Sequence, residues 1–254
     1  MTITNDEQKV ILIEAGKRLA AVLQALKEKV APGVTTEELD DLAEAMIRDG
    51  GDEPCFLGYM PEGAPRAYPA TLCVSINDEV VHGIPNEQTK VLKEGDIVGL
   101  DLGLSHQGII VDSAITVAVG KIDAESQKLL AATENALVAG IAAARPGGYI
   151  GDIGAAIQAE IEGAGFKVVK ELGGHGVGAK VHEEPFVPNF GRKGEGEELL
   201  VGMVLALEPI AAADRAAVMI APDGYTYRTK DGSRSAHFEH TILIEADGAR
   251  IITQ

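Results

Sequence analysis

The chain has 254 residues, of which 46% are hydrophobic and 24% charged, a globular composition that excludes a mainly disordered protein. Its 39 acidic and 22 basic side chains give a formal net charge of −17, which makes nucleic acid and anionic membranes poor partners. Two cysteines exclude a disulfide scaffold, no apolar run reaches the length of about eighteen residues that a membrane span needs, and the N-terminus lacks a secretory pattern. We therefore expect a cytoplasmic protein.

The first half of the chain begins with helical periodicity and continues with strands. A helix is predicted over residues 6–29, with Thr4 and Glu7 as its capping box. Pro32-Gly33 breaks it, and Thr35 with Glu38 opens a second helix that ends at Gly50-Gly51. A loop rich in glycine and proline follows over residues 52–69. The predicted strands then cover residues 72–76, 80–82, 97–104 and 108–119.

The second half repeats this order. Helices are predicted over residues 124–144 and 152–162, separated by Arg145-Pro146-Gly147, and strands over 166–169, 204–210, 225–229 and 237–245. Pro32 and Pro146 lie 114 positions apart, and Leu39, Ile47 and Gly51 match Ile153, Ile161 and Gly165 at that offset. The repeat favours an internal duplication over coincidence. We expect one α+β domain, residues 1–254, with similar halves of about 1–120 and 121–254.

Four acidic residues interrupt the apolar strand segments: Asp101, Asp112, Glu208 and Glu239. A buried, ionised carboxylate needs a partner, because its desolvation is otherwise prohibitive. A single such residue is more often solvent-facing, but four together favour a cation site. Few basic residues lie in these segments, although basic partners could arrive from elsewhere in the fold.

Hairpin geometry places two of these acids together. Asp101 and Asp112 lie symmetrically about His106-Gln107, the centre of a turn predicted at residues 105–108. Unless a bulge breaks that symmetry, they are cross-strand partners whose like charges require a cation between them.

Histidine supplies a further ligand type. His175 lies within Gly173-Gly174-His175-Gly176-Val177-Gly178, where glycines allow close backbone approach, and His182 follows seven residues later. One imidazole with four carboxylates suits manganese, iron(II) or cobalt better than a structural zinc. Four carboxylates exceed the needs of one ion, so we expect two bridged divalent ions that hold a hydroxide and polarise a carbonyl. The residues by themselves indicate hydrolysis of an amide or a phosphate ester.

In order, and over nearly its whole length, the chain resembles the type I methionine aminopeptidases. The matching stretches are residues 73–85, 95–98 with Asp101, Asp112, 174–178, 182–185, 202–203, 208–209 and 238–241. The resemblance implies the pita-bread fold, in which two pseudo-symmetric halves surround a central antiparallel sheet. It also implies removal of the initiator methionine from nascent chains, with a preference for a small second residue and attack of a metal-bridged hydroxide on the scissile carbonyl.

The resemblance also implies the role of each site residue. The metal ligands would be Asp101, Asp112, His175, Glu208 and Glu239, with Asp112 and Glu239 bridging. Glu208 would act as general base, His182 would stabilise the oxyanion, and His82 would hydrogen-bond the substrate backbone. The residues in or near the methionine pocket would be Cys73, Cys55, Tyr59, Val181 and Tyr225. Val181 and Tyr225 stand where many relatives have Phe and Trp, which leaves the pocket hydrophobic but changes its shape.

Two alternatives remain at this point. An Xaa-Pro peptidase of the same fold shares the motifs around His175 and His182, but usually carries a large N-terminal domain. A catalytically silent pita-bread binding protein would typically have lost ligands, and all five are present here. We expect methionyl peptides as substrates and a monomeric protein. We also expect a transient contact with the ribosome, although the negative net charge gives that contact no electrostatic support.

Overall fold

Each half of the chain opens with two helices separated by a Pro-Gly turn. The computed structural model describes residues 1–61 and 63–254, so Glu62 of the predicted loop lies outside the described residues. The helices in these ranges are α1 (Asp6–Lys29), α2 (Thr36–Asp49), α3 (Ala124–Ala143) and α4 (Ile150–Gly163). Within the same ranges, none of them is both long and apolar enough to cross a membrane.

Local capping sets where the helices begin. The box formed by Thr35 and Glu38 is confirmed at the start of α2. The predicted box of Thr4 and Glu7 is wrong, because Asn5 caps α1 by accepting a hydrogen bond from the Gln8 backbone. Helix α4 starts two residues earlier than predicted, since Asp152 is its third residue and accepts a hydrogen bond from the amide of Tyr149.

The strands of the first half are β1 (Glu53–Pro54), β2 (Leu72–Ile76), β3 (Glu79–Val81), β4 (Ile97–His106) and β5 (Ile109–Ala118). Those of the second half are β6 (Lys167–Val168), β7 (Gly173–Gly176), β8 (Glu183–Pro188), β9 (Val204–Leu207), β10 (Ile210–Ala212), β11 (Val218–Ile220), β12 (Tyr227–Thr229), β13 (Ser235–His237), β14 (His240–Glu245) and β15 (Gly248–Ile251). The prediction missed β1, β7, β8, β11 and β15. Four of these strands have at most four residues, which is too short for a periodic signal, and β8 contains Pro185 and Pro188.

Two predicted strands are each divided at an acidic residue. Glu208 and Pro209 separate β9 from β10, and Phe238 and Glu239 separate β13 from β14. Proline has no N–H with which to continue a ladder, and the strands on either side of each break belong to different sheets. Glu208 and Glu239 therefore lie at strand ends, not in the middle of strands as predicted.

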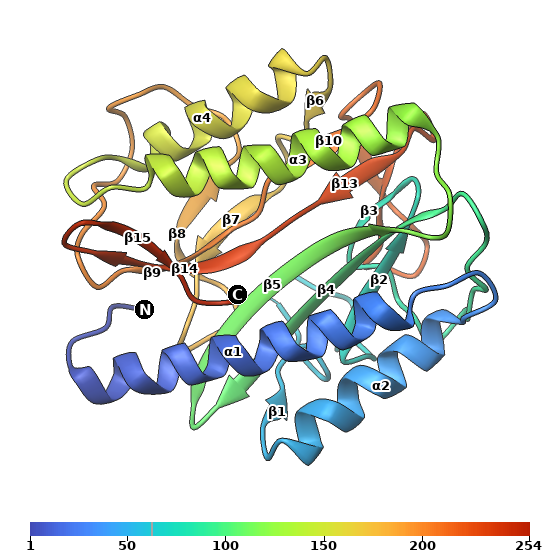
Figure 1. Ribbon diagram of the computed structural model, residues 1–254, viewed down its shortest axis with the longest axis horizontal. Helices are drawn as coiled ribbons and strands as arrows, with labels where there is room; N and C mark the ends of the chain where they lie inside the picture. The colour runs from blue at the N-terminus through green and yellow to red at the C-terminus, as the bar shows by residue number, and fades with distance from the viewer. Residues whose placement is uncertain (62) are drawn as a thin grey trace.

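All strand pairs in the described residues are antiparallel, which agrees with the predicted α+β class. The larger sheets have the orders β1-β4-β2, with β5 also paired to β4, and β15-β14-β9-β7-β8. Figure 1 shows α1 and α2 at one edge of the molecule and α3 and α4 at the other, with the strands between and behind them. The division of the chain into two similar halves stays a prediction.

The hairpin of β4 and β5 has a different register from the predicted one. Asp101 is paired with Ala114 and Asp112 with Gly103, so the two acids are diagonal neighbours on one face and not direct partners. The turn consists of Gln107 and Gly108, whose φ angles are 48° and 81°. Positive φ at both central residues is typical of a type I′ turn, which favours glycine at the second position and therefore shifts the centre by one residue.

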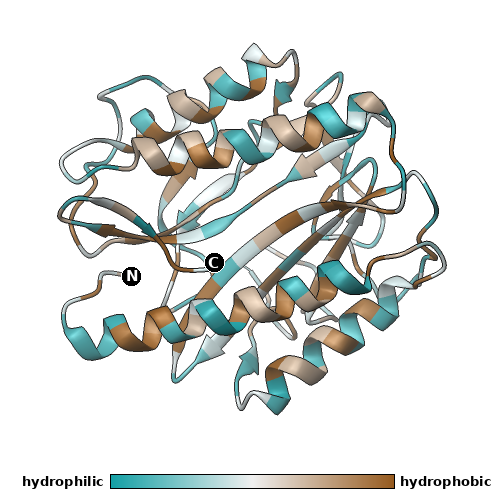
Figure 2. Ribbon diagram, viewed as in Figure 1, coloured by the Kyte–Doolittle hydropathy of each residue, from teal (hydrophilic) through white to brown (hydrophobic). Residues whose placement is uncertain are grey.

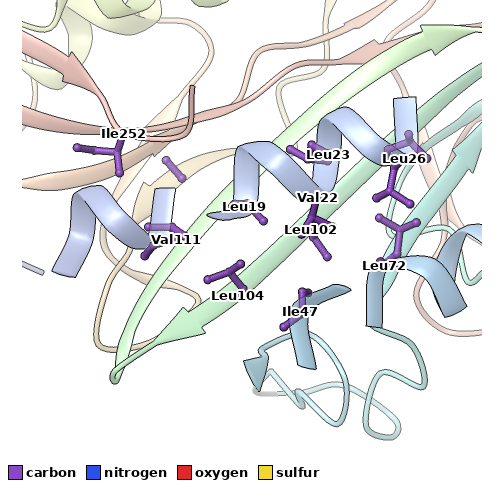
Figure 3. Packing of buried hydrophobic residues seen from close by; sticks show 14 of the residues in the cluster. Leu19, Val22, Leu23, Leu26, Ile47, Leu72, Leu102, Leu104, Val111 and Ile252 are labelled. Carbon is purple, nitrogen blue, oxygen red and sulfur yellow. The ribbon is translucent and has the colours of Figure 1, made fainter. Parts of the chain in front are cut away.

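A hydrophobic layer fixes α1 on the first sheet. Hydrophobic and hydrophilic bands alternate along α1 in Figure 2. Figure 3 shows Leu19, Val22 and Leu23 of this helix over Leu102 and Leu104 of β4, and all five are buried. Burying side chains of this size stabilises the fold by about 1.5–3 kcal/mol each. Since β4 also carries Asp101, this packing holds one wall of the site in place.

Candidate active site

A cavity of about 530 Å³ brings the predicted ligand residues together. All five of them line it: Asp101, Asp112, His175, Glu208 and Glu239. They come from β4, β5, β7, the end of β9 and the break between β13 and β14. These residues meet at one place because β5 runs beside the segment of Glu239 and β14: Glu239 and Ala114 exchange backbone hydrogen bonds of 2.8 and 3.4 Å.

The innermost residues of the cavity form a compact donor set. One ligand atom each from Asp112, His175 and Glu239 lie within 4.8 Å of one another. Glu208 Oε1 is 3.6 Å from His175 Nε2, which places this carboxylate beside the same group. Buried oxygens of Asp101, Asp112 and Glu239 have no hydrogen-bond partner among the described residues. Unpaired carboxylate oxygens beside an imidazole are the donors that a divalent cation takes, so the residues present fit metal ions.

Basic side chains do not compensate these acids in the part of the chain that the structure describes. The ion-pair contacts to the four carboxylates come from imidazoles: His175 and His237 lie near Glu208, and His237 also lies 3.8 Å from Glu239. The alternative of lysine or arginine partners is thereby removed for the described residues.

Burial sets the protonation of the carboxyl groups. It raises the pKa of Asp101 to about 7, with His237 opposing and Glu208 adding to the rise. Burial, followed by the charges of neighbouring acids, raises the pKa of Asp112 and of Glu239 well above the ordinary range. Glu208 differs, because nearby His237, His175 and His182 outweigh its burial and lower its pKa. A carboxyl group that stays ionised is suited to accept a proton.

Hydroxyl groups hold the ligand-bearing segments together. Thr241 Oγ1 accepts a hydrogen bond from the Asp112 amide at 2.9 Å and donates one to the Asp112 carbonyl at 2.8 Å. Ser113 Oγ donates to the carbonyl of Glu239 at 2.7 Å. Both hydroxyls are fully buried, so they fix the backbone of two predicted ligands without competing for the metal.

The three remaining imidazoles of the site have different positions. His82 follows β3 with a φ of 59°, lines the cavity, and has a pKa lowered to about 4, mainly by burial. His182 also lines the cavity, and its ring centroid is 4.4 Å from that of His175. His237 was missed by the sequence analysis. Its Nε2 lies 3.5 Å from Glu208 Oε2, and the only signal for it was its position two residues before Glu239.

The apolar end of the cavity contains most of the predicted pocket residues. Cys73, Tyr59, Val181 and Tyr225 line it. Cys55 packs against Cys73, Val181 and Tyr225 in one hydrophobic cluster but does not line the cavity, because its sulfur lies beside Gly103. Residues that the prediction did not name complete the wall, among them Phe56, Tyr68, Ile220 and Tyr227. Aromatic residues at scattered positions gave no periodic signal from which they could have been found.

Comparisons with known proteins by family model, by sequence and by structure agree with one another. The model of metallopeptidase family M24 matches residues 11–246. A methionine aminopeptidase of Aquifex aeolicus is 47% identical over 245 residues, which are 95% of this chain and 94% of the relative. The crystal structure of a methionine aminopeptidase from Thermotoga maritima superposes with a TM-score of 0.94 at 40% identity, covering 100% of this chain and 99% of the other.

A prolidase from Pyrococcus furiosus shares the fold alone. Its TM-score is 0.76 at 20% identity, and the match covers 100% of this chain but 65% of the prolidase. The architecture is therefore the predicted pita-bread fold, which both groups of structures have in common.

Proposed function

This chain belongs to metallopeptidase family M24, and on that premise we propose that it hydrolyses the peptide bond after an N-terminal methionine. The observation that carries the proposal is the cavity itself. Its lining combines Asp112, His175 and Glu239, whose ligand atoms lie within 4.8 Å of one another, with a cluster of buried apolar side chains. Such a site combines metal-assisted amide hydrolysis with recognition of one apolar side chain.

We propose that Asp101, Asp112, His175, Glu208 and Glu239 hold two divalent metal ions, with Asp112 and Glu239 shared between them. The unpaired oxygens of Asp101, Asp112 and Glu239 support this assignment. Oxygen-rich donors with one imidazole favour manganese, iron(II) or cobalt. Bound ions would polarise the scissile carbonyl and lower the pKa of the nucleophilic water.

Glu208 is the general base in this proposal. Its lowered pKa keeps the carboxylate ionised at neutral pH, so that it takes a proton from the attacking water and returns it to the leaving amine. His182 donates a hydrogen bond to the oxygen of the scissile carbonyl as negative charge develops on it. His82, which its low pKa keeps neutral, hydrogen-bonds the substrate backbone beside the scissile bond.

The apolar end of the cavity is the proposed methionine pocket. Cys73 and Val181 are almost fully buried, and Tyr68 and Tyr225 pack edge to face with centroids 5.1 Å apart. A soft, flexible thioether fits between sulfur and aromatic surfaces. This pocket would reject charged side chains, because its apolar cluster contains no charged residue among those that the structure describes. The preference for a small second residue is part of the proposal through the family resemblance.

We further propose that the enzyme is a cytoplasmic monomer that meets nascent chains through a transient ribosome contact. Among the described residues Cys55 and Cys73 both carry free thiols, as expected in a reducing compartment.

The test is hydrolysis of Met-Ala-Ser and Ala-Pro-Ser by metal-stripped protein to which manganese, cobalt or iron(II) is restored. We expect cleavage of the methionyl peptide only, and a loss of about a thousandfold or more in kcat for Glu208→Ala, because the base and a metal ligand are removed together. Glu160→Gln, on the exposed face of α4, is the control that should retain full activity. Cleavage mainly before proline would show an Xaa-Pro peptidase. Metal binding without cleavage of either peptide would indicate a silent binding protein.

A further inference from the structure

One hydrogen bond links the wall of the methionine pocket to an imidazole of the active site. Tyr59 Oη lies 2.8 Å from His182 Nδ1, and the centroids of the two rings are 5.4 Å apart. The partners are 123 positions apart in the chain. Tyr59 belongs to the loop that follows β1, and His182 to the connection between β7 and β8.

The backbone of Tyr59 is held by the pocket wall. Its amide donates to the carbonyl of Phe56 at 2.9 Å, and its carbonyl accepts from the amide of Tyr68 at 2.8 Å. The hydroxyl of Tyr225 lies 3.5 Å from the same carbonyl. The phenol is thus aimed at His182 from a backbone that is fixed on both sides.

The direction of this hydrogen bond depends on the tautomer of His182, and the properties of the phenol favour Tyr59 as the donor. A neutral imidazole has one N–H and one accepting nitrogen, whereas a phenol carries a proton to donate. The phenol keeps that proton at neutral pH, since burial raises the pKa of Tyr59. Within residues 1–61 and 63–254, Tyr59 Oη has no other hydrogen-bond partner. With Tyr59 as donor, Nδ1 of His182 accepts, and the ring proton lies on Nε2 at the opposite edge.

We propose that Tyr59 is a positioning residue that holds His182 as the Nε2–H tautomer, with this N–H turned away from Tyr59 toward the reacting carbonyl. The ring of His182 lies edge-on to His175, at 77° between planes, so a fixed tautomer presents its donor beside the metal-ligand group. The inference rests on the proposed function, because it assigns the origin of the hydrogen bond that His182 gives to the substrate.

Tyr59→Phe removes the hydroxyl and keeps the ring. With Met-Ala-Ser and metal-loaded enzyme, we expect kcat to fall about tenfold and KM to stay within about twofold, which corresponds to the loss of one hydrogen bond that acts in the transition state. Tyr149→Phe is the matched variant, because it removes a tyrosine hydroxyl at the start of α4, outside the residues that line the cavity. We expect it to leave both kcat and KM unchanged.

The second readout does not depend on activity. Long-range ¹H–¹⁵N correlation spectra of histidine-labelled protein, loaded with diamagnetic zinc, distinguish protonated from unprotonated ring nitrogens, and His182→Gln identifies the His182 signals among the six histidines. We expect Nε2–H in the wild type and in Tyr149→Phe, and a mixture of tautomers in Tyr59→Phe. An Nδ1–H tautomer in the wild type, or an unchanged kcat in Tyr59→Phe, would overturn the inference. Failure of the wild type to cleave Met-Ala-Ser would instead overturn the proposed function, while the spectra would still report on Tyr59.

Discussion

Three carboxyl groups in the cavity, those of Asp101, Asp112 and Glu239, hold protons more tightly than carboxyl groups in water. Burial raises the pKa of Asp101 from an ordinary 3.8 to about 7, and shifts Asp112 and Glu239 in the same direction. For an acid whose pKa is raised in the folded state, the contribution to stability is complete below the ordinary pKa and is lost as the pH rises through the folded value. Metal-free protein should therefore lose stability between about pH 4 and 7.

The same shifts predict how the site takes up metal. Asp101, Asp112 and Glu239 must release protons before they can act as ligands, so we expect manganese affinity to rise between pH 6 and 8, with net release of protons on binding. Titration calorimetry in buffers of different ionisation enthalpy measures that release directly. The Asp112→Asn variant lacks one of these acidic groups and one ligand. It should therefore bind manganese more weakly and release fewer protons on binding. Affinity that is independent of pH would contradict the assignment of these acids.

At the scale of elements, β7 shows why glycine surrounds His175. A Cβ added to Gly174 would overlap the carbonyl oxygen of Ala206 in β9, whereas one added to Gly163, the last residue of α4, would meet nothing within 4 Å. We expect Gly174→Ala to destabilise the protein by about 1–3 kcal/mol and to weaken metal binding through displacement of His175. Gly163→Ala is the control and should stabilise by up to about 1 kcal/mol. Urea unfolding of both variants checks the contrast, and equal effects would disprove it.

At the scale of the whole molecule, the predicted ligands come from both sides of the midpoint of the chain. Asp101 and Asp112 come from the first predicted half, and His175, Glu208 and Glu239 from the second. Between them, Thr116 Oγ1 donates to the carbonyl of His237 at 2.7 Å and accepts from its amide at 2.9 Å. Bound metal would therefore add a further link between the two halves.

This arrangement predicts a single thermal unfolding transition, whose midpoint temperature rises when metal binds. At a manganese concentration of about 100 times Kd, the gain is about 2.7 kcal/mol, or roughly 5–10 °C for a chain of this size. Calorimetry of stripped and reloaded protein tests this expectation, with Glu208→Ala giving a smaller shift. Two separate transitions, or none that responds to metal, would count against one cooperative domain held together at its centre.

Local chemistry in the sequence was sufficient for much of this description. The Thr35 capping box and the Pro-Gly breaks act within a few residues, so the helices were predicted nearly to their ends. Four acids in apolar segments and a histidine among glycines identified the candidate ligands, because burial of charge is costly wherever the chain leads. The turn at Gln107-Gly108 could also have been predicted from the sequence, because glycine is favoured at the second central position. The prediction overlooked this glycine and placed the turn one residue too early.

Contacts between distant segments needed the tertiary structure. Pro209 ends β9, but only the packing of separate sheets places Glu208 beside His175 and His237. The same packing brings Phe56 into the cavity in place of Cys55, and Tyr59 to His182. The sequence by itself determined which residues could do the chemistry, since residue type and local context decide charge, capping and turns. Only the fold decided their partners, because those distances depend on how sheets and loops more than a hundred positions apart pack together.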